Sequence, residues 1–197
     1  MNTPIKLKIA LQELPHKCER TLLVSRNINM EQLHYIIQVA FGWENAHLFE
    51  FRNAKRQASI RVGIPDDFDM DFGGVKTLKA HRVKLEKTFV IENEAKPLWY
   101  NYDFGDDWLH RISFLKTTKK DLEIFEGKPI CTKAIGKCPP EDVGGPWGYV
   151  DFLETLKDED HPEHEELKEW YGIEGDEDYD EIKVNLQDIN KLLKTAI

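Results

Sequence analysis

Residues 4–14 read PIKLKIALQEL, and apolar side chains stand at every second position from Ile5 to Leu11. This period of two is typical of a β-strand with one buried face, because successive side chains of a strand point to opposite sides. Pro15 and His16 break the run, and residues 18–25 form a second extended run. The two runs together predict an N-terminal β-hairpin.

A helix is predicted directly after the hairpin. Asn29 can accept hydrogen bonds from the free N–H groups of a helix start, and Gln32, three positions on, suits a capping box. Gly42 is placed to end the helix, since glycine tolerates the left-handed conformation that helix ends adopt. The expected buried face follows the helical spacing at Leu33, Ile36, Ile37, Ala40 and Phe41.

The rest of the chain changes from extended to helical patterns. Extended runs predict strands at residues 47–52, 58–64, 99–104, 108–116 and 130–135. Helical patterns predict a short helix at residues 83–89 and three helices at residues 149–156, 162–170 and 182–193. Strands first and helices last favour an α+β fold, a single-domain roll with a mostly antiparallel sheet and a helical C-terminal third. With no linker or repeat between the halves, we expect one domain over residues 1–197.

Composition narrows the class of protein. The chain is 41% hydrophobic and 32% charged, which excludes collagen-like and largely disordered proteins. Its three cysteines form no C-x-x-C pair, so we expect reduced thiols. No apolar run approaches the roughly 20 residues of a membrane span, and residues 1–8 lack the apolar stretch of a secretory signal. The sequence therefore predicts a cytoplasmic protein without a membrane partner.

The net charge of −9 is unevenly distributed. Residues 151–181 hold 15 Asp or Glu against two Lys, which makes this segment −13 and leaves +4 for the remainder. Binding to free duplex DNA requires Lys and Arg that replace phosphate counterions, so this charge disfavours it. A basic protein is the partner that the acidic segment favours.

Two turns concentrate groups that can hold a metal ion. Residues 100–110, YNYDFGDDWLH, place carboxylates on a predicted hairpin tip and His110 on the return strand. Residues 138–149, CPPEDVGGPWGY, place Glu141 and Asp142 in a rigid turn before a helix. A structural interpretation also stands for each, since Asp and Gly favour turns, carboxylates cap helices, and His110 can be a buried residue bonded to an aspartate. Trp108 lies on the apolar face of its strand and is expected in the core.

Several of these blocks resemble those of the plasmid Ri ORF-three-like family, some of whose members travel as passenger proteins of insertion elements. The resemblance rests on YDFGD at residues 102–106 with the following Trp108 and His110, on CPPED at 138–142 with the following glycines, and on the upstream FGW at 41–43. It covers nearly the whole chain. It implies a compact α+β roll and implies little about activity, because the family carries no established biochemical function.

Two functions remain open at this point. One is a non-catalytic interaction module, connected with mobile-element functions through the resemblance, whose acidic segment contacts a basic protein. The other is a divalent-metal-dependent hydrolase or nuclease-like enzyme, with Mg²⁺, Mn²⁺ or Zn²⁺ as its cofactor. Its candidate metal ligands are Asp103, Asp106, His110, Glu141 and Asp142, and His47 or His110 is its candidate general base or further ligand. Convergence of the two turns in space would favour the enzyme, and separation would favour the module.

Overall fold

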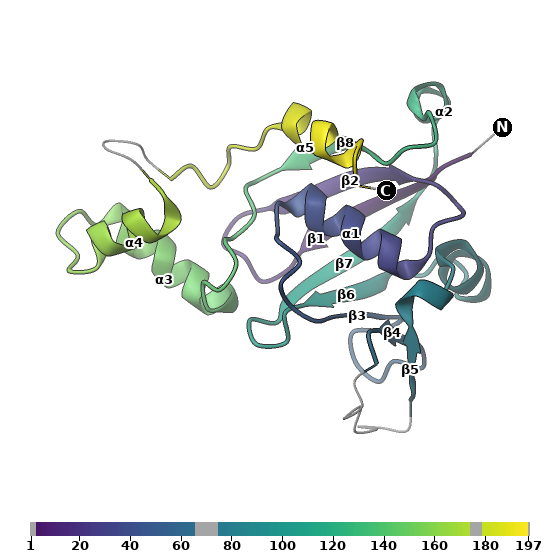
Figure 1. The fold of residues 1–197 in the computed structure, drawn as a ribbon, viewed down its shortest axis with the longest axis horizontal. Coiled ribbons are helices and arrows are strands. Elements are labelled where there is room, and N and C mark those ends of the chain that lie inside the picture. The colour runs from purple at the N-terminus through teal and green to yellow at the C-terminus, as the bar shows by residue number, and fades with distance from the viewer. Residues whose placement is uncertain (1–2, 66–74, 174–178, 197) are drawn as a thin grey trace.

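An eight-stranded sheet, in the order β5-β4-β3-β6-β7-β1-β2-β8, organises the molecule (Figure 1). The computed structural model describes residues 3–65, 75–173 and 179–196. The strands are β1 Ile5–Leu11, β2 Cys18–Val24, β3 Phe49–Arg52, β4 Arg61–Gly63, β5 Thr77–Lys79, β6 Leu98–Tyr102, β7 Trp108–Leu115 and β8 Ile130–Ile135. All neighbours pair antiparallel except β4 and β5. The predicted α+β fold with a mostly antiparallel sheet is confirmed.

The N-terminal hairpin forms the centre of one half of the sheet. β1 pairs with β2 on one side and with β7 on the other, so that Ile9 lies opposite both Arg20 and Ile112. The apolar side chains that alternate along β1 are buried, and the lysines between them are only partly buried. The period of two therefore predicted both the strand and its buried face correctly.

Helix α1, Met30–Phe41, lies across one face of the sheet (Figure 1). The Asn29 side chain accepts a hydrogen bond from the Gln32 backbone N–H, and the Gln32 side chain accepts one from the Asn29 N–H. At the other end Gly42 adopts the left-handed conformation, with φ 86°. The apolar face predicted from the helical spacing is buried, and each leucine, isoleucine or phenylalanine on it contributes about 1.5–3 kcal/mol. The helix and both of its caps are confirmed.

Short elements in the middle of the chain differ from the prediction. The strand expected at residues 58–64 is limited to β4, and the helix expected at 83–89 is replaced by a 3-10 turn, η1 Ala80–Arg82, and a π-helical turn, η2 Glu86–Glu92. Strand β5 and the short helix α2, Lys119–Ile124, were not predicted. Elements of three to six residues carry too few positions to show a period, so tertiary contacts decide them.

The C-terminal part contains the three expected helices with changed bounds: α3 Gly145–Lys157, α4 His164–Tyr171 and α5 Leu186–Leu193. Helix α5 begins later than predicted, because Asn185 caps it. It packs beside α1 and β8, while α3 and α4 lie together at one end of the molecule (Figure 1).

Three further expectations concern membrane spans, the cysteines and the number of domains. Among the described residues, no helix has the length and apolar character that crossing a bilayer requires. The three cysteines are free and buried. The assignment of residues 1–197 to one domain stays a prediction.

Candidate metal centre

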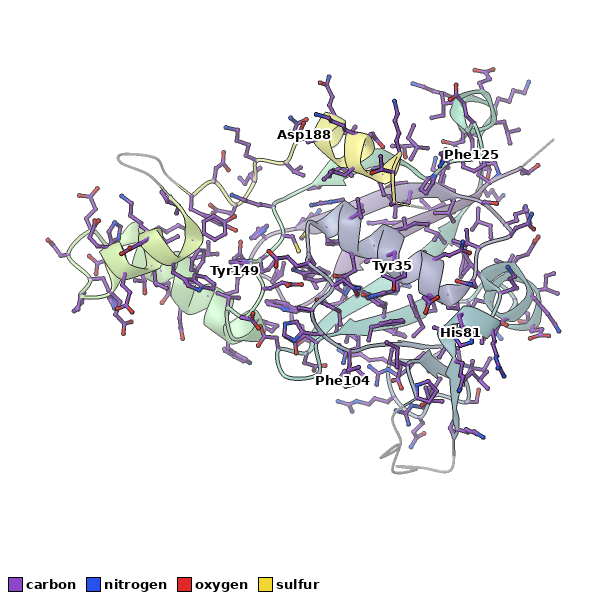
Figure 2. All side chains as sticks on the ribbon, viewed as in Figure 1. Tyr35, His81, Phe104, Phe125, Tyr149 and Asp188 are labelled. Carbon is purple, nitrogen blue, oxygen red and sulfur yellow. The ribbon has the colours of Figure 1, made fainter. Side chains whose placement is uncertain are left out.

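The turn between β6 and β7 meets the turn that precedes α3. The backbone N–H of Gly144 donates a hydrogen bond of 3.2 Å to Asp106 Oδ2. A Cβ atom on Gly145 would lie 2.4 Å from the carbonyl oxygen of Asp106. Figure 2 labels one residue of each segment, Phe104 in the β6–β7 turn and Tyr149 in α3. The two acidic turns that the sequence singled out therefore converge in space.

Three side chains from different segments form a compact cluster at this junction. His47 Nε2 lies 3.6 Å from Asp103 Oδ2 and 3.2 Å from Asp142 Oδ1. One ligand atom from each residue lies within 4.8 Å of the others. The Asp103 side chain is only 11% exposed, whereas that of Asp142 is 71% exposed, so the cluster has a protein side and a solvent side. The site can therefore hold a small cation with coordination positions left open to water.

The ring nitrogen of His47 lacks a satisfactory partner among the described residues. Nε2 is shielded from solvent and forms no hydrogen bond of acceptable geometry, although two carboxylate oxygens lie near it. A shielded polar atom without a partner destabilises the folded state. A divalent cation between the nitrogen and the carboxylates would pair all three groups.

Asp103 is oriented by the turn that contains it. Its Oδ1 atom accepts hydrogen bonds from the N–H groups of Gly105 and Asp106, which leaves Oδ2 directed toward His47. The backbone of Asp103 is left-handed, with φ 55°, and its N–H donates to the carbonyl oxygen of Leu48. The turn thus holds Asp103 in one orientation next to the His47 loop, residues 42–48 between α1 and β3.

Tyr102, just before the β6–β7 turn, connects the His47 loop to the turn before α3 by hydrogen bonds. Its hydroxyl oxygen accepts hydrogen bonds from the N–H groups of Ala46, at 3.0 Å, and His47, at 3.3 Å, and its O–H donates to Glu141 Oε1 at 2.6 Å. The N–H of Glu44 donates to the same carboxylate. Burial and the neighbouring Glu141 carboxylate raise the pKa of Tyr102, so the phenol remains a donor. Sequence reasoning missed this role of Tyr102.

A buried polar ring holds the other end of the same loop. Gln38 donates to the hydroxyl of Tyr100, which can donate to Nδ1 of His34. Nε2 of His34 can then donate to Asn45 Oδ1, and the Asn45 N–H donates to Gln38 Oε1. Every member is satisfied when His34 is neutral, and burial lowers the pKa of His34 to about 4.

The structure separates the other candidate residues from the cluster. Asp106 is engaged with Gly144, and Glu141 with Tyr102. His110 is fully buried, and it hydrogen-bonds the carbonyl oxygen of Trp108 instead of the aspartates considered in the sequence. Its surroundings explain this placement, because the rings of Phe41 and Trp43 lie edge-on at 4.9 and 5.1 Å. Burial lowers the pKa of His110 to about 3.

The ligand set drawn from the sequence therefore differs from the cluster that the structure brings together. Asp103 and Asp142 are common to both, and His47, considered only as a base or further ligand, takes a central place. The available signal for His47 was its position just after a capped helix, which directs the chain back to the sheet. That signal identifies a loop, but it does not say which carboxylates the loop meets.

The profile of the family described as plasmid pRiA4b ORF-3-like protein matches residues 3–188. The chain belongs to this family. A family relative, the uncharacterized protein y4hQ of Sinorhizobium fredii, is 37% identical over 187 residues, which are 95% of this chain and 89% of that protein. A crystal structure of MM3350, a protein of unknown function from Methanosarcina mazei, is similar with a TM-score of 0.75 and 30% identity, covering 95% of this chain and 97% of that one.

Membership of the pRiA4b ORF-3-like family confirms the resemblance found in the sequence. The blocks that carried the resemblance are distant along the chain and gather at one place in the fold. Trp43 donates a hydrogen bond to the carbonyl oxygen of Pro139 and stacks on Tyr102 with ring centroids 4.9 Å apart. The FGW, YDFGD and CPPED blocks therefore build the junction that carries the cluster.

The junction of the two turns can be tested with Gly145→Ala. This substitution should cost about 1–2 kcal/mol for the left-handed backbone, at φ 71°, and further energy for the 2.4 Å approach to Asp106. Gly172→Ala is the matched control, because its φ is 77° and nothing lies within 4 Å of the added Cβ. Urea denaturation should show a clearly larger loss for Gly145→Ala; equal losses would contradict the close contact of the turns.

Proposed function

We propose that this protein binds a divalent metal ion at His47, Asp103 and Asp142 and uses it for hydrolysis. The observation that carries the proposal is the convergence of three ligand atoms within 4.8 Å, from three separate segments. The shielded Nε2 of His47, which forms no hydrogen bond of acceptable geometry with the two nearby carboxylates, supports the same site. One imidazole and two carboxylates suit Zn²⁺ or Mn²⁺ better than Mg²⁺, which prefers oxygen ligands.

The chemistry follows from the number of ligands. His47, Asp103 and Asp142 would hold the ion, as three protein ligands do in catalytic zinc sites, and the ion would supply an activated water and polarise a substrate carbonyl or phosphoryl group. Exposed apolar side chains stand next to the ligands in the chain: Leu48 follows His47, and Phe104 follows Asp103. Their exposure makes them available to contact a substrate.

Metal binding is tested by titration of metal-free protein with Zn²⁺, Mn²⁺ and Mg²⁺. We expect Zn²⁺ or Mn²⁺ to raise the melting temperature, because an ion that binds only the folded state stabilises it by about 2.7 kcal/mol at a hundredfold excess over Kd. His47→Gln and Asp142→Asn should weaken binding by at least about tenfold. Metal-dependent cleavage of ester and phosphodiester substrates should be lost in the same variants.

Two substitutions serve as controls for this titration. His81→Gln and Asp160→Asn make the same chemical changes at exposed positions outside the cluster, and both should bind metal like the unchanged protein. If no divalent ion shifts the melting curve, or if the controls lose as much affinity as the cluster variants, the metal proposal is wrong.

A second candidate function is the interaction module, associated with mobile-element functions through the family resemblance. The concentration of 15 acidic residues in residues 151–181 supports it, because such a surface attracts a basic protein. The two functions are compatible, since Asp142 lies beside this acidic region. Substitution of the metal ligands should impair metal-dependent hydrolysis. Substitution of acidic residues of the C-terminal region should impair binding of a basic protein.

A further inference from the structure

Helices α3 and α4 lie together at one end of the molecule (Figure 1), and residues of both helices line a cleft, the α3–α4 cleft. It has a volume of about 430 Å³. Val143, Phe152 and Leu167 contribute apolar lining, and Trp170 is also part of the wall. The rings of Phe152 and Trp170 meet edge-to-face at 6.1 Å, and the Trp170 residue remains 49% exposed. The α3–α4 cleft therefore combines an apolar surface with an accessible indole ring.

The polar lining of the α3–α4 cleft is acidic. Four carboxylates contribute to it: Asp142, Asp151, Glu163 and Glu166. Among the described residues that line it, none is a lysine, arginine or histidine. Within the described part of the chain, no salt bridge includes Asp151, Glu163 or Glu166. Like charges gathered around one cavity repel one another, and a cation placed between them relieves that repulsion.

The spacing of α4 explains why acid and aromatic groups share the cleft. Glu163 is the N-cap residue of α4, and Glu166, Leu167 and Trp170 follow it by three, four and seven positions, so the four residues lie on one side of the helix, along the cleft shared with α3. Glu169 belongs to the same helix, is exposed and does not line the cleft. The helix thus directs part of its negative charge into the cavity and part into solvent.

We propose that the α3–α4 cleft binds an arginine side chain from a basic segment of a partner protein. A guanidinium group is planar, can stack on the Trp170 indole and can donate paired hydrogen bonds to carboxylates. A nucleic acid backbone is disfavoured by the same carboxylates. This inference deepens the interaction-module function and does not rest on metal binding.

The test measures fluorescence anisotropy of a labelled peptide of alternating glycine and arginine, in buffer with EDTA. The matched peptide contains citrulline, which keeps the shape of arginine and removes its charge. We expect the arginine peptide to bind with an affinity that falls as salt rises, and the citrulline peptide to bind at least about tenfold more weakly. A random duplex DNA should not compete.

Matched variants locate the binding. Glu166→Gln should weaken the arginine peptide by about fivefold, whereas Glu169→Gln, with the same charge change on the same helix, should change affinity less than about twofold. Trp170→Leu should weaken binding by about fivefold, and Trp147→Leu, at an 86% exposed tryptophan outside the cleft, should not. Circular dichroism melts verify that each variant is folded.

Each outcome has a defined meaning. Binding that is lost equally in Glu166→Gln and Glu169→Gln would overturn the cleft while leaving a basic partner for the acidic region as a whole. Absence of binding to the arginine peptide, or equal binding of the citrulline peptide, would overturn both the cleft and the basic-partner function. The EDTA in every sample keeps these results independent of the metal titration.

Discussion

Replacing Trp108 by alanine should lower the free energy of unfolding by about 3–5 kcal/mol. Trp108 is fully buried, which confirms its predicted place in the core, and it is the first residue of β7, opposite Tyr102 of β6. Its ring lies 6.1 Å from that of Trp43. The loss combines the transfer of a large apolar side chain with the cavity that a rigid sheet cannot close.

Equilibrium denaturation with urea measures this change directly. Trp147→Ala is the matched control, because Trp147 is 86% exposed and its loss should cost less than about 0.5 kcal/mol. Trp108→Ala should also disturb the cluster of His47, Asp103 and Asp142, since Tyr102 accepts a hydrogen bond from the His47 N–H and Trp43 donates one to the carbonyl oxygen of Pro139, in the turn that contains Asp142. Similar losses for the two tryptophan variants would remove Trp108 from the core.

Acidification from pH 7 to pH 4 should destabilise the protein by several kcal/mol. Burial lowers the pKa of His34 to about 4 and that of His110 to about 3 in the folded state, against 6.5 in the unfolded chain. Below pH 6.5 both histidines therefore become protonated in the unfolded chain, while they stay neutral in the folded protein. The free energy of unfolding keeps the full contribution of the two neutral histidines above pH 6.5. It decreases as the pH falls toward their folded-state pKa values, by roughly 3 kcal/mol per histidine at pH 4.

Urea denaturation at a series of pH values from 7 to 4 measures this linkage. His110→Phe keeps a flat ring between Phe41 and Trp43 and removes one titrating group, so the dependence of stability on pH should fall by about half. His81→Gln, at an exposed position, should leave the dependence unchanged. An unaltered dependence in His110→Phe would show that His110 does not cause the acid sensitivity.

Arg20 illustrates a limit of reading the sequence. The alternation along β2 points its side chain to the buried face, where a charged residue is unexpected, and the structure shows it 2% exposed. Its guanidinium donates to the carbonyl oxygens of Ala40, Ile135 and Gly136, and it lies over the Phe41 ring at 5.0 Å. These acceptors come from α1 and from the end of β8, so no local pattern around Arg20 could identify them.

The cluster of His47, Asp103 and Asp142 was also only partly predictable from the sequence. The residue types in the sequence singled out the two acidic turns, and one residue of each turn, Asp103 and Asp142, lies in the cluster. The residue types did not separate those two from Asp106 and Glu141, because all four are carboxylates in turns. The distinction depends on which donors surround each one: Gly144 for Asp106, and Tyr102 with Glu44 for Glu141.

The sequence by itself determined the features whose causes lie within a few residues. The strand at Ile5–Leu11 follows from a period of two, and the helix Met30–Phe41 follows from its spacing and from the Asn29 and Gly42 caps. Only the tertiary structure decided the parallel pairing of β5, the burial of His110 and the meeting of His47 with two aspartates. These depend on strand register and on contacts between segments up to about a hundred residues apart, for which the chain carries no local hydrogen-bonding or hydrophobic signal.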